Sequence, residues 1–246
     1  IAIYDYGRSF EGEFYYAMEY LPGIDLESLV AGWGQLPPER VVPILIQICD
    51  GLAEAHHRGL VHRDIKPANI IVSRLGTRID VVKILDFGLV KELESPSDLG
   101  SNHHFAGTPA YMSPEAISAP GEIGPASDLY ALGAIGFYLL AGDVLFTGST
   151  LQEIFDHHLK TPPRFPSSES KYPVPQALDE IILRCLAKNP DERFPSAASI
   201  REALAGVDVG VYRGGERWWE KFEQARVRVE EPVSSDPTLN VHWQGR

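Results

Sequence analysis

Two short segments of this chain carry side chains that can act together in phosphoryl transfer. They are His62-Arg63-Asp64-Ile65-Lys66-Pro67-Ala68-Asn69 and Asp86-Phe87-Gly88. Transfer of a phosphoryl group from ATP asks a protein for positioning and charge neutralisation more than for covalent chemistry. Asp64 can take the proton of the acceptor hydroxyl, and Lys66 can offset the charge of the transferred group. Asn69 and Asp86 offer hard oxygen ligands, which suit Mg²⁺.

A third segment follows in order, Gly107-Thr108-Pro109-Ala110-Tyr111-Met112-Ser113-Pro114-Glu115. With it, the chain resembles the protein kinase family, most closely the eukaryotic-type Ser/Thr kinases of bacteria. The resemblance covers approximately residues 1–205. It implies an α+β, protein kinase-like fold with a mostly α-helical C-lobe and a partial β N-lobe. It also implies a signalling enzyme that uses ATP and Mg²⁺ to phosphorylate Ser or Thr hydroxyls of protein substrates.

The resemblance assigns roles to the motif residues. Asp64 is the catalytic base, and Asn69 and Asp86 hold the metal. Lys66, two positions after the base, is typical of Ser/Thr kinases rather than tyrosine kinases. The hydroxyl of Thr108 is expected to bond Asp64 and Lys66, and the residues after it to hold the acceptor peptide.

Three further residues are expected to support this machinery. By the same resemblance, Glu115 forms a buried ion pair with Arg193 and so anchors the peptide-binding region. Asp128, in a helical segment, bonds the backbone of the catalytic loop. Each of these residues alone would be read as an ordinary surface carboxylate or guanidinium, and only their shared order favours the functional interpretation.

The segment Met18-Glu19-Tyr20-Leu21 resembles the hinge between kinase lobes. By that match, Met18 is the gatekeeper, and the Glu19 carbonyl and the Leu21 amide bond adenine. Ile71 is expected under the adenine ring, and Asp25 near the ribose. An apolar slot with a few fixed backbone polar groups is what a nucleotide base requires.

Three parts are expected along the chain. Residues 1–24 form a remnant of the N-lobe with two strands and the hinge, residues 25–205 the C-lobe, and residues 206–246 a partly disordered extension. The Gly-rich loop, the strand Lys and its helix partner, which precede these motifs in the family, are absent from this sequence. We therefore expect this polypeptide alone to be nearly inactive, although the gene product is expected to be a competent kinase.

Hydrophobic periodicity and turn residues predict the elements. Strands are expected at 1–6 and 14–20, and a small β-ribbon at 70–73 and 81–85. Asp25 is expected to cap a short helix. Longer helices are expected from Pro37 to near Gly59 and at 126–141, 151–159, 176–187 and 197–205, and an amphipathic helix at 217–222. The Ser-rich stretch 92–105 is predicted to be a mobile loop, and 230–246 a poorly ordered tail.

Regulation by phosphorylation is a further hypothesis. In the family, an Arg before the catalytic Asp, here Arg63, helps bind a phosphate on the activation segment. The segment offers Ser95, Ser97 and Ser101, and Ser101 is our candidate for the regulatory phosphosite.

Composition excludes some classes of function. The net charge of −12 argues against bulk nucleic-acid binding, although it would attract a basic substrate. Cys49 and Cys185 lie in apolar helical patterns and are expected to be buried free thiols. The apolar run 129–141 is too short to span a bilayer, so we expect a cytoplasmic protein whose membrane attachment is possible only through segments outside this chain. The sequence leaves the oligomeric state open.

Alternative interpretations remain at this point. A pseudokinase scaffold is disfavoured because it has no chemical need for all four motif residues. A kinase-like small-molecule phosphotransferase generally lacks the segment from Thr108 to Glu115. The paired histidines at 56–57, 103–104 and 157–158 are expected to be solvated or packing residues rather than metal ligands, because adjacent helical positions point to different faces.

Overall fold

The computed structural model describes residues 3–8, 14–85 and 108–230. The expectations for the motif 86–88, the loop 92–105, Ser101 and the C-terminal tail concern residues outside these ranges. The chain forms two compact units, Ile1–Val211 and Tyr212–Arg246, which we describe separately.

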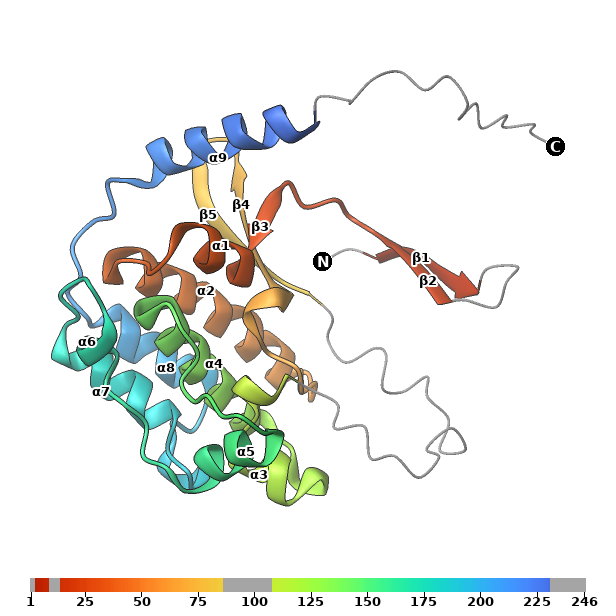
Figure 1. The fold of residues 1–246 in the computed structure, drawn as a ribbon. Coiled ribbons are helices and arrows are strands. Elements are labelled where there is room, and N and C mark those ends of the chain that lie inside the picture. Colours follow the sequence, from red (N-terminus) through yellow and green to blue (C-terminus); the bar gives the residue numbers. More distant parts are fainter. Residues whose placement is uncertain (1–2, 9–13, 86–107, 231–246) are drawn as a thin grey trace. The chain divides into compact units, whose positions relative to one another are not determined.

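The first two strands form an antiparallel pair (Figure 1). Strand β1 (Ile3–Arg8) lies beside β2 (Phe14–Met18), with Tyr6 opposite Tyr16 and Arg8 opposite Phe14. Aromatic and β-branched residues favour this extended conformation, so the prediction of two strands is confirmed.

A second sheet has the strand order β3 (Gly23–Asp25), β4 (Ile70–Leu75), β5 (Arg78–Ile84), and both pairs are antiparallel. The β4–β5 hairpin confirms the predicted ribbon. The sequence did not predict β3, because Leu21-Pro22-Gly23 reads as a strand breaker. The ribbon matters for the site because it begins directly after Asn69 and ends two residues before Asp86.

Gly23 allows the close approach of β3 to β4. A Cβ atom at this position would lie 2.2 Å from the carbonyl oxygen of Val72. We expect Gly23→Ala to lower the free energy of unfolding by about 1–3 kcal/mol, because the strands would have to separate. Gly32, inside a helix, is the matched control, since its Cβ would meet nothing within 4 Å. Gly32→Ala is expected to stabilise by about 0.5–1 kcal/mol in the same urea titration. Equal effects of the two substitutions would contradict this interpretation.

Most of the predicted helices are confirmed. They are α1 (Leu26–Trp33), α2 (Pro38–His57), α4 (Pro125–Ala141), α5 (Leu151–Lys160), α7 (Gln176–Cys185) and α8 (Ala197–Ala205). Two short helices were not predicted, α3 (Pro114–Ser118) and α6 (Pro166–Glu169). Single 3₁₀ turns occur at η1 (Pro67–Asn69), η2 (Pro109–Tyr111), η3 (Pro120–Glu122) and η4 (Pro190–Glu192).

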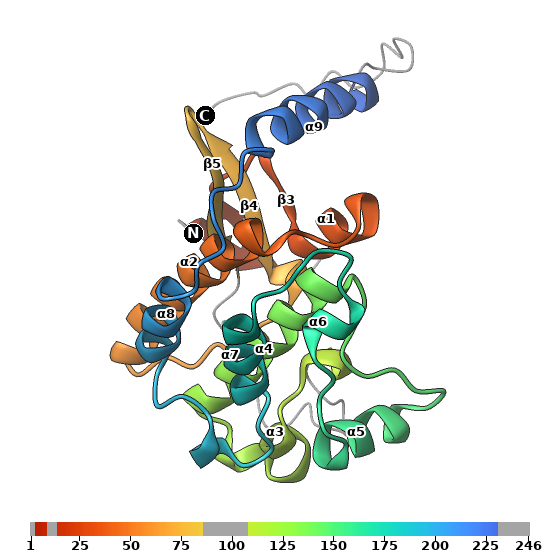
Figure 2. The ribbon, with the colours of Figure 1, turned by 90° about the vertical axis from the view of Figure 1, so that its left-hand side faces the viewer.

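Helix α4 is the centre of the core. It is buried from Ser127 to Ala141 and packs against α2, α6 and α7 (Figures 1 and 2). Gly133 permits the contact with α7, because a Cβ there would lie 2.7 Å from the Cβ of Cys185. Cys49 and Cys185 are buried and free, as predicted. A helix that is buried on every side can hold functional groups rigidly at its first turn, where Asp128 lies.

The second unit contains helix α9 (Gly215–Glu230), which is longer than the predicted segment 217–222. Trp218 stacks on Phe222 one turn later, with ring centroids 5.4 Å apart and an interplanar angle of 8°. Within the described residues, no helix combines the length and the apolar character needed to cross a membrane.

Candidate active site

Asp128 holds the backbone of the loop that carries the motif. Its side chain is 1% exposed and accepts hydrogen bonds from the amides of His62 and Arg63, each at 2.9 Å. Nε2 of His56, at the end of α2, lies 2.8 Å from the same carboxylate. Arg63 has a φ of +67°, a left-handed conformation that is uncommon for residues other than glycine. The expected contact of Asp128 with the catalytic loop is therefore present, and it stabilises an unusual backbone.

Three of the four predicted motif side chains meet in this loop. Nζ of Lys66 lies 2.8 Å from Oδ2 of Asp64. Nδ2 of Asn69 donates to the Asp64 carbonyl at 2.9 Å and to its Oδ2 at 3.2 Å. Oδ1 of Asn69 accepts no hydrogen bond from the described residues and remains available to a cation. The loop thus presents a carboxylate, an ammonium group and an amide oxygen together.

Asp86 lies outside the described residues, but the segment leading to it is anchored at the loop. The amide of Leu85 donates to the carbonyl of Asn69 at 2.8 Å. Nε2 of His62, which is fully buried, lies 2.7 Å from the Leu85 carbonyl. Nδ1 of His62 accepts from the amide of Asp64 at 3.3 Å, so this network assigns the proton to Nε2. His62 therefore connects Asp64 to the end of the β-ribbon.

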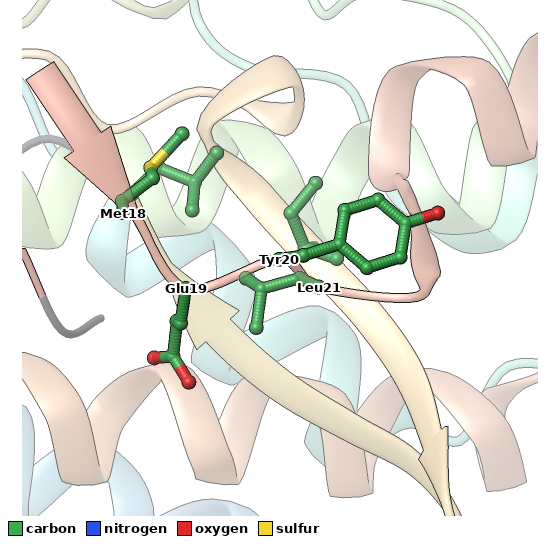
Figure 3. Close-up of a pocket in the computed structure, with 6 residues that line it drawn as sticks. Met18, Glu19, Tyr20 and Leu21 are labelled. Atoms are coloured by element: carbon green, nitrogen blue, oxygen red, sulfur yellow. The ribbon is translucent and has the colours of Figure 1, made fainter. Parts of the chain in front are cut away.

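The predicted hinge residues line an open cavity of about 370 Å³. Its walls are Met18, Glu19, Tyr20, Leu21, Ile71 and Leu85. The side chains of Met18 and Glu19 leave the chain in opposite directions (Figure 3). Oε1 of Glu19 lies 3.2 Å from Nζ of Lys83 on β5, a contact that the sequence did not suggest. The cavity falls within the usual range of about 300–1,000 Å³ for small-molecule sites.

Asp25 is the N-cap of α1, as predicted. Its Oδ1 accepts from the amide of Ser28 and its Oδ2 from the hydroxyl of the same residue, both at 2.7 Å. The expected contact with a ribose stays a prediction. The hydrogen bond expected from Thr108 to Asp64 and Lys66 is not present among the described residues. It also stays a prediction.

The predicted ion pair between Glu115 and Arg193 is present. Arg193 is fully buried and forms a two-pronged contact with the carboxylate, at 2.7 and 2.8 Å. The remaining donors of its guanidinium bond the carbonyls of Ala126, Ala187 and Lys188. Burial opposes ionisation of Glu115, but the bonds from Arg193 and Ser127 outweigh it and lower the pKa of the carboxyl.

Two of the described histidines, His56 and His158, form side-chain contacts within the chain. No group of three or more His, Cys, Asp or Glu residues in the described chain is arranged to hold a metal ion. His56 donates a hydrogen bond to Asp128. The sequence did not indicate this bond, because paired histidines were considered only as metal ligands. His158 is fully buried on α5, and its Nδ1 lies 2.8 Å from the hydroxyl of Tyr130.

Burial of His158 should make stability depend on pH. Burial, together with the nearby charge of Lys188, lowers the pKa of His158 from 6.5 to about 4. Below pH 6.5 the unfolded chain therefore binds a proton that the folded chain does not. We expect the free energy of unfolding to fall by about 2 kcal/mol between pH 7 and pH 5 from this group.

Urea titrations of His158→Gln, which can still bond Tyr130, should show a smaller fall over this pH range. His57→Gln, at an exposed position on α2, is the control and should follow the parent protein. A parent protein equally stable at both pH values would contradict the prediction.

A model of the protein kinase domain matches residues 1–204. The chain belongs to the protein kinase family. The kinase fold and the resemblance to the eukaryotic-type Ser/Thr kinases of bacteria are thereby confirmed, and this family generally uses ATP and Mg²⁺.

Relatives of this kinase chain include two proteins of Myxococcus xanthus. Serine/threonine-protein kinase pkn3 is 36% identical over 212 residues, which cover 85% of this chain and 39% of pkn3. Serine/threonine-protein kinase Pkn1 is 43% identical over 192 residues, which cover 77% of this chain and 27% of Pkn1. The chain thus spans well under half the length of these curated relatives.

Solved kinase structures resemble this kinase chain in fold. The kinase domain of Mycobacterium tuberculosis PknI matches with a TM-score of 0.61 and 30% identity, over 82% of this chain and 69% of that one. Rad53 1-466 in complex with AMP-PNP matches with a TM-score of 0.67 and 25% identity, over 83% of this chain and 50% of that one.

Proposed function

We propose that the protein containing this chain is a Ser/Thr protein kinase that transfers the γ-phosphoryl group of ATP to Ser or Thr hydroxyls of protein substrates. The convergence of Asp64, Lys66 and Asn69 in a loop fixed by Asp128 carries this proposal. The pocket at the hinge fits an adenine ring, with the Glu19 carbonyl and the Leu21 amide as its polar partners and Ile71 as its apolar wall. Met18 closes one side of this pocket, and Asp25 is proposed near the ribose.

The residues present fit magnesium and a nucleotide. Oδ1 of Asn69, which accepts no hydrogen bond from the part of the chain that the structure describes, is a hard ligand, and Asp86 is proposed as the second. Bound Mg²⁺ would neutralise phosphate charge. Asp64 orients the acceptor hydroxyl and accepts its proton, and Lys66, held 2.8 Å from Asp64, compensates the negative charge beside it. Thr108 and the segment up to Glu115 are proposed to position the acceptor peptide.

The test is transfer of labelled phosphate from ATP to a generic protein substrate, followed by analysis of the modified amino acids. We expect phosphoserine and phosphothreonine. Phosphotyrosine, or phosphate on a small molecule only, would contradict the proposal. A parallel assay of the polypeptide 1–246 tests the expectation that it is nearly inactive alone, and mass spectrometry of the autophosphorylated protein tests Ser101.

A further inference from the structure

An ion pair connects the predicted hinge to the three-stranded sheet. Oε1 of Glu19 lies 3.2 Å from Nζ of Lys83 on β5, although the two residues are 64 positions apart in the chain. Their side chains are 26% and 36% exposed, so water reaches the pair only in part. Adenine is proposed to bond the backbone carbonyl of Glu19. The carboxylate of the same residue therefore needs a separate explanation.

Lys83 stands in a row of side chains that crosses the sheet. Asp25 on β3 pairs with Ile71 on β4, and Ile71 pairs with Lys83 on β5. Residues directly opposite each other in antiparallel strands place their side chains on the same face. All three residues are half-buried, and Ile71 lines the hinge cavity. Lys83 therefore lies on the face that borders the cavity, beside the residue expected under the adenine ring.

Strand β5 gives Lys83 a rigid base, because α2 holds it. Nε2 of Gln47 on α2 donates to the carbonyl of Asp80 at 2.9 Å, and its Oε1 accepts from the amide of Val82 at 3.1 Å. The guanidinium of Arg40, on the same helix, binds both carboxylate oxygens of Asp80 at 2.8 Å. The Lys83 side chain thus starts from a backbone that is attached to a helix of the core.

The hinge itself is an irregular segment. Residues 19–22 lie between β2 and β3 and belong to neither strand. The amide of Gly23 donates to the carbonyl of Leu21 at 2.8 Å and closes a tight turn at the end of this segment. At its start, the side chain of Glu19 is directed away from that of Met18 and reaches Lys83 (Figure 3). The ion pair therefore fixes the segment at the residue whose carbonyl is proposed to bond adenine.

We propose that Lys83 is a positioning residue for nucleotide binding, which holds Glu19 and so presets the hinge backbone that bonds adenine. This inference rests on the proposed function. Groups that are in place before a ligand arrives lose less conformational freedom when it binds, so the pair raises affinity without touching the ligand. Because the pair acts through the hinge, the gain should be equal for adenosine and for ATP. A direct attraction of Lys83 for the phosphates would favour ATP alone.

The experiment measures the Kd of adenosine and of ATP by calorimetry in the protein that contains this chain. Lys83→Met, which keeps most of the stem and removes the charge, should raise both Kd values by about two- to fivefold. The KM for ATP should rise by the same factor, while kcat at saturating ATP stays unchanged. Glu19→Gln should have the same effect, and combining the two substitutions should add no further loss, because each one already removes the pair.

Two further variants complete the design. The exchanged pair Glu19→Lys/Lys83→Glu should recover most of the affinity for both ligands, which a merely structural role of either residue would not predict. Lys160→Met is the matched control, since Lys160 pairs with Asp156 at 2.7 Å on an exposed face of α5. It should leave both Kd values at those of the parent protein.

The outcomes separate this inference from the proposed function. A rise in Kd that adenosine and ATP share, and that Lys160→Met does not cause, supports the inference. If Lys83→Met bound both ligands as tightly as the parent, or weakened ATP alone, the inference would be overturned and the proposed function would stand. A parent protein that bound neither adenosine nor ATP would overturn both.

Discussion

Asp64→Asn should lower kcat by about 10²–10⁴-fold with little change in affinity for ATP, measured in the protein that contains this chain. The substitution keeps the shape of the side chain and its ability to accept the bond from Asn69. It removes the negative charge that takes the proton and that pairs with Lys66 at 2.8 Å. The loss should therefore fall on the chemical step, which steady-state and single-turnover rates together would reveal.

Asp156→Asn is the matched control for this prediction. Asp156 also pairs with a lysine, Lys160 at 2.7 Å, but on an exposed face of α5. Its replacement should leave kcat unchanged. If Asp64→Asn transferred phosphate as fast as the parent, Asp64 would not be the base. If it lost transfer but kept a signalling role in cells, the scaffold interpretation would gain support.

Arg193→Met should lower the free energy of unfolding by about 3–5 kcal/mol. The substitution leaves the Glu115 carboxyl, whose side chain is 10% exposed, without its partner and removes the donors to three backbone carbonyls. Methionine fills part of the space, so the loss comes mainly from unpaired polar groups. Arg193→Lys, which keeps the charge but not the planar fork, should also destabilise, though less. Urea titration monitored by circular dichroism would measure both effects.

Arg201→Met provides the comparison for a surface pair. Arg201 bonds Asp50 at 2.7 Å, with side chains 47% and 54% exposed. The expected loss is below about 1 kcal/mol, because both charges stay in water when the pair is broken. If Arg193→Met and Arg201→Met lowered the free energy of unfolding equally, burial would not determine the strength of the ion pair between Arg193 and Glu115.

The contacts within the loop 62–69 could be predicted from the sequence, because they depend on residue types at fixed spacing within a few positions. Asp64, Lys66 and Asn69 meet as expected, and Asp25 caps α1. The long helices also followed from local patterns, since α7 buries one apolar face and α4 is an almost continuous apolar run that is buried on every side. Such local patterns contain the information that the structure uses.

Other features depend on partners far away in sequence. Strand β3 has only three residues and exists through its pairing with β4, about 50 positions later. Helix α3 has five residues, and its Glu115 is held by Arg193 from beyond α7. Neither carries a periodic pattern. The contacts of His56 with Asp128 and of Glu19 with Lys83 likewise join distant segments, so residue type alone could not indicate them.

The left-handed backbone at Arg63 has a consequence for biosynthesis. Its geometry depends on a carboxylate that lies 65 positions downstream in the chain. While the polypeptide emerges from the ribosome, the loop is translated long before the helix that shapes it. A nascent or prematurely terminated chain that ends before α4 would therefore contain the reactive residues without their working arrangement, and catalytic competence would arise only late in synthesis.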